Sequence, residues 1–265
     1  MIDKTDAFLL CRNLTPPELA PCLFGDNRIL IQAAARRMQF FPYHEIKNTI
    51  ALLARSRYCR HRAAAAFIRS QIQTPITAGE AREILGLTAD TLANDKSRKV
   101  QAEAALALGH LFSRQTVPAK QFDTVEKQVR PLFAAPPPSL ACALSFAAAY
   151  LPARKYIRDF LIRNLNSGQR QTLSWSLFAL NMKSWYCRRA AAVLSAKLDF
   201  IRPYSPLYCD VAAYLVRCRC SAVIPYLKKA VGRRRLDDEI YRSLYDSDFA
   251  PFAALRREML ERFGG

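Results

Sequence analysis

The sequence predicts an all-α protein made of short helices that stack on one another. Only 8 of the 265 residues are glycine, whereas alanine-rich runs recur along the chain. This composition favours helices over the glycine-rich turns of a β-sandwich or barrel. Hydrophobic residues make up 51% of the chain, which is enough to fill a sizeable core. We therefore expect a folded, helical protein and exclude a disordered one.

One kind of predicted helix carries a stripe of alanines that follows a capping residue. Asp26 stands six residues before Gln32 and its alanine run, and Asp95 stands six residues before Gln101 and a second run. Asp at a helix N-terminus accepts hydrogen bonds from unpaired backbone N–H groups, and alanines let neighbouring helices approach closely. Three further segments share this character: Arg62 with residues 63–66, in which Ser56 takes the place of the Asp, Arg189 with residues 190–194, and residues 139–151.

The other kind of predicted helix is amphipathic and alternates with the first kind. Its apolar residues recur at helical spacing. The segments of this kind are residues 43–54, 78–93, 122–133 and 154–165. Equivalent positions Gln32, Arg62 and Gln101 are separated by 30 and 39 residues, close to the ~40 residues of helical-pair repeats. The chain therefore reads as irregular repeats of helix, turn and helix.

Residues 95–111 resemble the second helix of a HEAT-like repeat, which has the pattern D-x-x-x-x-V-R-x-A-A-x-x-A-L-G-x-L. Gln101 replaces the usual arginine of that pattern, whereas Arg62 and Arg189 keep it. The resemblance covers about the first 112 residues and implies a right-handed α-solenoid of stacked antiparallel helix pairs. It also implies that the repeat arginine pairs with the capping Asp of a neighbouring repeat. Proteins of this kind are mostly binding scaffolds, and a smaller group, similar to DNA alkylation-repair glycosylases, acts on DNA.

The expected organisation is a single elongated domain over residues 1–265. Residues 134–138 contain three consecutive prolines, which forbid a helix, so a bend would fall there. Residues 200–206, with Pro203 and Pro206, form a second interruption. Residues 237–265 are expected to form a terminal helical cap.

Charge is distributed unevenly along the chain. The protein has 40 Lys and Arg against 22 Asp and Glu, a formal net charge of +18. Residues 137–236 hold 17 basic and three acidic residues, a balance of +14, whereas residues 1–136 have +7 and residues 237–265 have −3. A basic stretch on a stacked scaffold creates a positive field that attracts acidic partners.

We predict that this stretch contains the partner-binding surface. The predicted binding residues are Arg154, Lys155, Arg158, Lys183, Arg188, Arg217, Arg219, Lys228, Lys229, Arg233, Arg234 and Arg235. The same stretch holds both tryptophans and seven of the eleven tyrosines, and aromatic rings interleaved with arginines can stack on bases. The tyrosines considered are Tyr186, Tyr204, Tyr208 and Tyr214. Alternatively, these charges are the solvated faces of ordinary helices and the aromatic residues belong to the core.

The sequence favours a non-catalytic scaffold that binds an acidic protein, with nucleic-acid binding as the alternative and a glycosylase-like enzyme less favoured. No acid lies near Trp175 or Trp185 between Asp159 and Asp199, where a glycosylase would need one. The chain has no nucleophile-elbow, P-loop or H-E-x-x-H motif. We therefore expect no cofactor.

Neither a metal site nor a membrane span is expected. Cys218 and Cys220 form an isolated C-x-C pair, and the three histidines lie far from it in the sequence. The opening residues lack the features of a secretory signal, and no apolar run approaches the ~18 residues of a membrane span. These features predict a cytoplasmic protein with free thiols and no integral membrane association.

Overall fold

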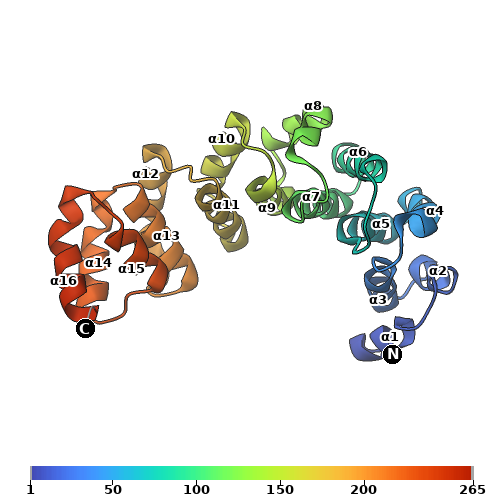
Figure 1. The fold of residues 1–265 in the computed structure, drawn as a ribbon, viewed down its shortest axis with the longest axis horizontal. Helices are drawn as coiled ribbons and strands as arrows, with labels where there is room; N and C mark the ends of the chain where they lie inside the picture. Colours follow the sequence, from blue (N-terminus) through green and yellow to red (C-terminus); the bar gives the residue numbers. More distant parts are fainter. Residues whose placement is uncertain (1, 264–265) are drawn as a thin grey trace. The chain divides into compact units, whose positions relative to one another are not determined.

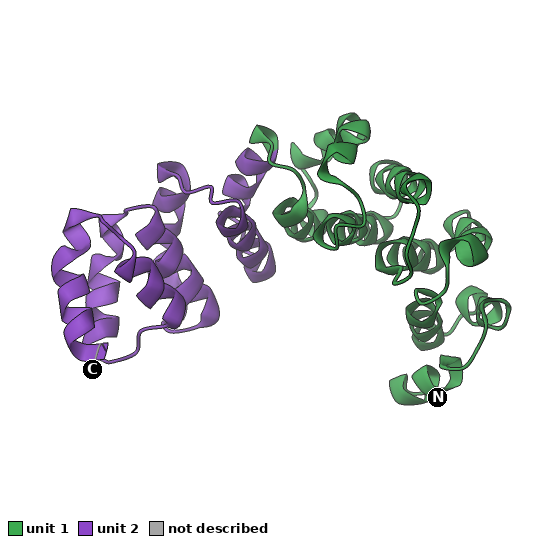
Figure 2. Ribbon diagram, in the orientation of Figure 1, with its two compact units in different colours: residues 1–156 green, residues 157–265 purple. Residues whose placement is uncertain are grey.

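The computed structural model describes residues 2–263. The described chain is 74% helical and contains no strand, which confirms the all-α prediction. It forms two compact units, residues 1–156 (unit 1) and residues 157–265 (unit 2), of which residues 1, 264 and 265 lie outside the described part (Figure 2). None of the described helices has the length and apolar character that crossing a membrane requires.

Unit 1 contains two rows of helices. The elements are α1 (Lys4–Cys11), α2 (Pro16–Phe24), α3 (Arg28–Met38), α4 (Tyr43–Ala54), α5 (Cys59–Gln71), α6 (Ala78–Asn94), α7 (Arg98–Ser113), α8 (Glu126–Val129) and α9 (Pro138–Tyr150), with the 3₁₀ helices η1 (Ala119–Thr124) and η2 (Arg130–Phe133). Helices α1, α3, α5, α7 and α9 pack successively, while α2, α4 and α6 each pack on the helix that follows them (Figure 1). The alternation of two helix types in the sequence thus becomes an alternation of two rows.

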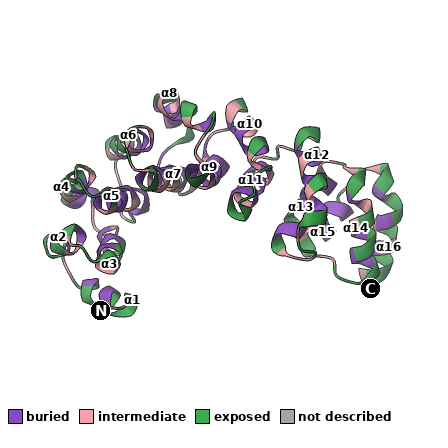
Figure 3. Cartoon of the chain, turned by 180° about the vertical axis from the view of Figure 1, so that it is seen from behind, coloured by how far each residue is buried: buried purple, intermediate pink, exposed green. Residues whose placement is uncertain are grey.

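Helices α1, α3, α5, α7 and α9 form the row that we call the inner row, and small residues fill the spaces between its helices. Ala34, Ala64, Ala105 and Leu108 are all buried, as the alanine stripes predict. Figure 3 shows buried positions concentrated on α5, α7 and α9. At Gly109 a β-carbon would lie only 2.9 Å from the Cα of Ala147, so this glycine permits the close approach of α7 and α9.

The helix starts differ in detail from the predicted caps. Asn27, not Asp26, caps α3, because its Oδ1 accepts hydrogen bonds from the N–H groups of Ile29 and Leu30 at 2.9 and 3.3 Å. Asp26 instead forms an ion pair with Arg60. Likewise Asp95 precedes the N-cap residue of α7, Ser97, and accepts a hydrogen bond from its N–H at 2.8 Å. The expectation that the two Asp residues cap these helices is therefore wrong.

Prolines account for two further differences. Residues 122–133 do not form one helix; they divide among η1, α8 and η2, where Pro131 lacks the N–H that a continuous helix needs. Of the three prolines at 136–138, Pro138 does lie in a helix, because it occupies the first position of α9. A backbone N–H at that position has no partner within the helix, so its absence in proline costs nothing there. Packing of α9 on α7 continues across this segment.

Unit 2 is built around α13. The elements are α10 (Lys155–Asn164), which begins at the end of unit 1, α11 (Arg170–Met182), α12 (Arg188–Lys197), α13 (Pro206–Arg217), α14 (Ile224–Gly232), α15 (Asp238–Tyr245) and α16 (Ala253–Phe263), with the 3₁₀ helices η3 (Leu198–Phe200), η4 (Ser221–Val223) and η5 (Ala250–Phe252). Helix α13 contacts α11, α12 and α15, and α14 packs on α16. The described part of the predicted cap, residues 237–263, is mainly helical; Gly264 and Gly265 lie outside it.

Candidate functional site

Three of the predicted binding residues form ion pairs within the fold. In unit 1, Arg154 pairs with Asp123 and, at 3.0 Å, with Glu126. In unit 2 the partners are Glu239 for Arg217 and Asp248 for Arg219. Arg219 donates hydrogen bonds to both Asp248 carboxylate oxygens, at 2.6 and 2.9 Å, and Arg217 donates one to the Asn181 Oδ1 at 3.4 Å. Each of these three arginines therefore has a carboxylate partner within the fold.

The other predicted residues differ in exposure. Lys183 is half-buried, and this burial lowers the pKa of its ammonium group. Lys155, in unit 1, is exposed, and Arg158, in unit 2, is partly exposed. The exposed members in unit 2 are Arg188, Lys228, Lys229, Arg233, Arg234 and Arg235. Within residues 2–263, no ion pair is formed by these six.

Arg235 belongs to a basic cleft in unit 2. The cleft has a volume of about 760 Å³ and lies where the N-terminal ends of α11 and α13 meet the end of α12 and η3. Arg170, Lys197 and Arg202 also line it, whereas none of its lining residues is an aspartate or glutamate. We call this hollow, with its four cations Arg170, Lys197, Arg202 and Arg235, the basic cleft. It gathers cations that are up to 65 residues apart in the sequence.

Local structure sets the shape of the cleft. The loop between η3 and α13 crosses it, and Tyr204 in that loop has a backbone φ of 60°, in the left-handed region. The Ser205 hydroxyl then caps α13 by accepting a hydrogen bond from the Tyr208 N–H at 3.3 Å, and Pro206 takes the first helical position. The Arg235 guanidinium lies 5.7 Å from the centre of the Tyr204 ring, a cation–π contact across the cleft.

The cleft also presents apolar surface. Phe200 is 87% exposed, the highest value among the large apolar side chains that are exposed. Ile201 and Leu207 add further apolar lining. An apolar surface beside four cations suits a ligand that combines negative charge with apolar groups.

Two of the tyrosines considered for base stacking belong to the core instead. Tyr214 is fully buried, and its hydroxyl donates a hydrogen bond to the Trp185 carbonyl oxygen at 2.7 Å. Tyr208 is 6% exposed. The expectation that these two rings stack on bases is wrong, while Tyr186 and Tyr204 keep partial exposure.

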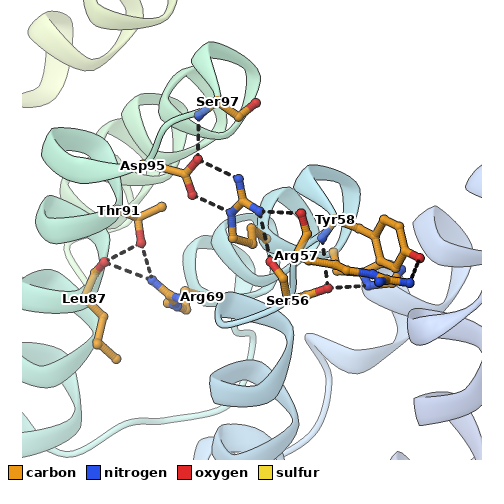
Figure 4. Close-up of polar contacts among 10 residues, drawn as sticks. Ser56, Arg57, Tyr58, Arg69, Leu87, Thr91, Asp95 and Ser97 are labelled. Atoms are coloured by element: carbon orange, nitrogen blue, oxygen red, sulfur yellow. Dashed lines mark hydrogen bonds and ion pairs between the residues drawn. The ribbon is translucent and has the colours of Figure 1, made fainter.

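The repeat arginine Arg62 is part of the structural framework of unit 1, and two of its partners, Asp95 and Ser56, are labelled in Figure 4. Its Nε and Nη2 donate hydrogen bonds to the two carboxylate oxygens of Asp95 at 2.7 and 3.0 Å, and its Nη1 donates to the Ser56 carbonyl oxygen at 2.9 Å. This contact joins α5 to the turn between α6 and α7. Arg62 therefore pairs with Asp95, as the resemblance implies, although Asp95 does not cap α7. Burial by itself would raise the pKa of Asp95, but the hydrogen bonds from Arg62 and the Ser97 N–H lower it overall.

Sequence reasoning missed Arg170, Lys197 and Arg202. The signal that could have found two of them is the interruption at residues 200–206, because Lys197 precedes it and Arg202 lies within it. Nothing in the sequence indicates that Arg170 reaches the same cleft, since only the packing of α11 near the start of α13 brings it there.

No protein-family model matches this chain, and no curated protein sequence matches it. Solved structures do resemble it. The X-ray structure of YibA from Escherichia coli has a TM-score of 0.77 and 17% sequence identity, and the match covers 100% of this chain and 93% of that one. The crystal structure of an engineered protein has a TM-score of 0.51 and 14% identity, over 99% of this chain and 71% of that one. At such low identity the likeness shows the fold alone.

Proposed function

We propose that this chain is a non-catalytic helical-repeat scaffold, a right-handed solenoid of HEAT-like helix pairs, that binds an acidic segment of another protein. The observation that carries the proposal is the basic cleft, whose lining has four cations and no carboxylate. Opposite charges guide such a partner to the cleft and set its orientation there. The exposed Arg233 and Arg234, adjacent in sequence to Arg235, extend the positive surface.

A protein partner is favoured over a nucleic acid by the chemistry of the lining. Phe200 and Ile201 offer contacts to apolar side chains, which an acidic peptide has and a phosphate backbone lacks. Burial of Tyr208 and Tyr214 also removes two of the rings that a nucleic acid could use for stacking.

The test is a binding measurement with a fluorescein-labelled peptide of Glu-Glu-Leu repeats. A triple variant, Arg170→Ser, Lys197→Ser and Arg202→Ser, should bind this peptide about tenfold more weakly, which corresponds to ~1.4 kcal/mol. A matched control replaces the exposed Lys96, Lys120 and Lys127 of unit 1 with serine, which removes the same charge away from the cleft. The control should bind as the wild type does.

The alternative is tested with an oligothymidylate in place of the peptide. Binding of the oligonucleotide without binding of the peptide would favour the nucleic-acid function, and its affinity should then fall steeply with salt. If the cleft variant and the control weaken peptide binding equally, only net charge matters and the cleft is not the site. Binding of neither probe would refute the proposed function.

A further inference from the structure

Unit 1 contains a second hollow that the charge distribution of the sequence does not indicate. It lies on the inner helices α3, α5 and α7 and has a volume of about 260 Å³. Every residue that lines it belongs to unit 1, so it is separate from the basic cleft. We call this hollow the inner groove.

Cations from three helices surround the inner groove. Arg28 and Arg36 lie eight residues apart on α3, about two turns, and therefore on the same face of that helix. Arg60 stands at the start of α5 and Lys99 in the first turn of α7. Arg28, Arg36 and Lys99 are exposed, and within residues 2–263 none of the three forms an ion pair.

The fourth cation is only partly satisfied. Arg60 pairs through Nη2 with Asp26, whose side chain is 92% exposed, so this pair is open to water. The Nε of Arg60 is buried and has no hydrogen-bond partner in the described chain. A buried donor without an acceptor is unfavourable, so the guanidinium of Arg60 is not fully satisfied by the fold.

One carboxyl group lines the groove. Burial raises the pKa of Glu103, while the neighbouring Lys99 acts in the opposite direction. Even with Asp26 paired to Arg60, the carboxylates of Asp26 and Glu103 are set against four cations, which leaves the groove positive and complementary to an acidic ligand.

The floor of the groove is made of small side chains. Ala35, Ala63 and Ala64 leave the space open between the cations, and Phe67 gives it an apolar wall. An adjoining hollow shares Gln32 and Arg36 with the groove and reaches Phe8 on α1, which is 54% exposed. The two hollows together cross α1, α3, α5 and α7.

We propose that the inner groove binds an acidic peptide segment whose apolar side chain inserts between α3 and α5. Its volume is below the ~300–1,000 Å³ of small-molecule pockets, so it accommodates side chains of a longer ligand and not a cofactor. Its continuation toward Phe8 provides contacts for an extended chain. The apolar floor distinguishes this ligand from a nucleic acid, which lacks aliphatic side chains.

The test uses the full chain with its basic cleft already altered by Arg170→Ser, Lys197→Ser and Arg202→Ser. In this background the labelled Glu-Glu-Leu peptide should still bind, and adding the groove changes Arg28→Glu, Arg36→Glu and Lys99→Glu should weaken binding at least about tenfold. The control carries Lys96→Glu, Lys120→Glu and Lys127→Glu in the same background, an equal charge change outside the groove. It should retain binding.

Photo-crosslinking locates the peptide without any change in the groove. A peptide with photoreactive leucine should crosslink to the segments of α3 and α5 that contain Ala35, Ala63 and Phe67. Absence of binding in the cleft-altered background, crosslinks confined to other helices, or equal loss in the groove variant and its control would each overturn the proposal. Stronger competition by oligothymidylate than by the unlabelled peptide would also overturn it, in favour of a polyanion.

The two proposals fail separately. If the cleft changes leave the wild-type affinity unaltered while the groove changes abolish binding, the proposed function of the cleft is wrong and the groove stands. If the cleft changes alone abolish binding, the groove proposal is wrong and the cleft stands.

Discussion

Replacing Gly109 with alanine tests how closely α7 and α9 must approach. A β-carbon at this position would lie 2.7 Å from Cε1 and 2.9 Å from Cδ1 of Phe146, and 2.9 Å from the Cα of Ala147. Favourable carbon–carbon contacts are ~3.5–4.0 Å, so the added methyl group overlaps both residues. The Phe146 ring can rotate, but the backbone of Ala147 can move only if the two helices separate.

The magnitude follows from two opposing effects. Overpacking of this kind costs about 1–3 kcal/mol, and the backbone overlap places Gly109→Ala in the upper part of that range. Alanine gains about 1 kcal/mol over glycine within a helix. We therefore expect a net loss of about 1–2 kcal/mol in the free energy of unfolding, which is a fall in Tm of roughly 2–8 °C for a chain of this size.

Gly86 on α6 provides a matched control. A β-carbon there meets no atom within 4 Å, so Gly86→Ala should receive the helix-propensity gain without the overlap. Urea unfolding followed by far-ultraviolet circular dichroism should show the control at or above wild-type stability and Gly109→Ala below it. If Gly109→Ala is as stable as Gly86→Ala, the close packing of α7 on α9 is wrong.

Three further perturbations test other parts of the structure. Ala105→Phe, at a fully buried position, should cost ~1–3 kcal/mol in urea unfolding because the inner row has no space for a ring; unchanged stability would contradict the packing. Arg62→Ala should cost about 1–3 kcal/mol near pH 7, because it leaves the Asp95 carboxylate half-paired. The folded pKa of Asp95 is lowered, so the stabilisation by its carboxylate is present above pH ~4 and is lost as the pH falls through the folded pKa. The unfolding free energies of wild type and Arg62→Ala should therefore converge in acid. A difference that stays constant with pH would contradict this. Changing Arg233, Arg234 and Arg235 to serine should weaken binding of the Glu-Glu-Leu peptide while the Tm stays nearly unaltered. Exposed charges each contribute only about 0–1 kcal/mol to stability. A large fall in Tm would mean that these residues are structural.

Much of the helix arrangement could be predicted because local patterns determine it. Residues 43–54 are predicted as a helix and form α4 (Tyr43–Ala54). The alanine stripe predicted the burial of Ala34 and Ala105, since small residues at helical spacing serve close packing. The prediction of a helix over residues 122–133 failed because the spacing of apolar residues takes no account of Pro131, which interrupts the hydrogen bonds of a continuous helix. A helix prediction from apolar periodicity must therefore also take the positions of prolines into account.

The candidate sites were less predictable because they depend on which residues the fold brings together. Arg235 was found from its neighbours in the sequence, whereas Arg170 reaches the same cleft only through packing. The inner groove is harder still, because Arg28, Arg60 and Lys99 come from three helices in a stretch with modest net charge. Counting charges along the chain cannot reveal either combination.

Ion pairing explains why the net charge of residues 137–236 does not by itself give the charge at any one place on the surface of unit 2. Residues 237–265 are acidic as a group, and two of their carboxylates, Glu239 and Asp248, neutralise Arg217 and Arg219 of the basic stretch. The lining of the basic cleft includes no such carboxylate, so the cleft keeps a positive charge. If the proposed function holds, association of the acidic peptide should slow as added salt shortens the Debye length toward about 8 Å at physiological ionic strength. Residues 237–265 thus pair with one part of the basic stretch and leave the cations of the cleft, on which the proposed function rests, without a carboxylate among the lining residues.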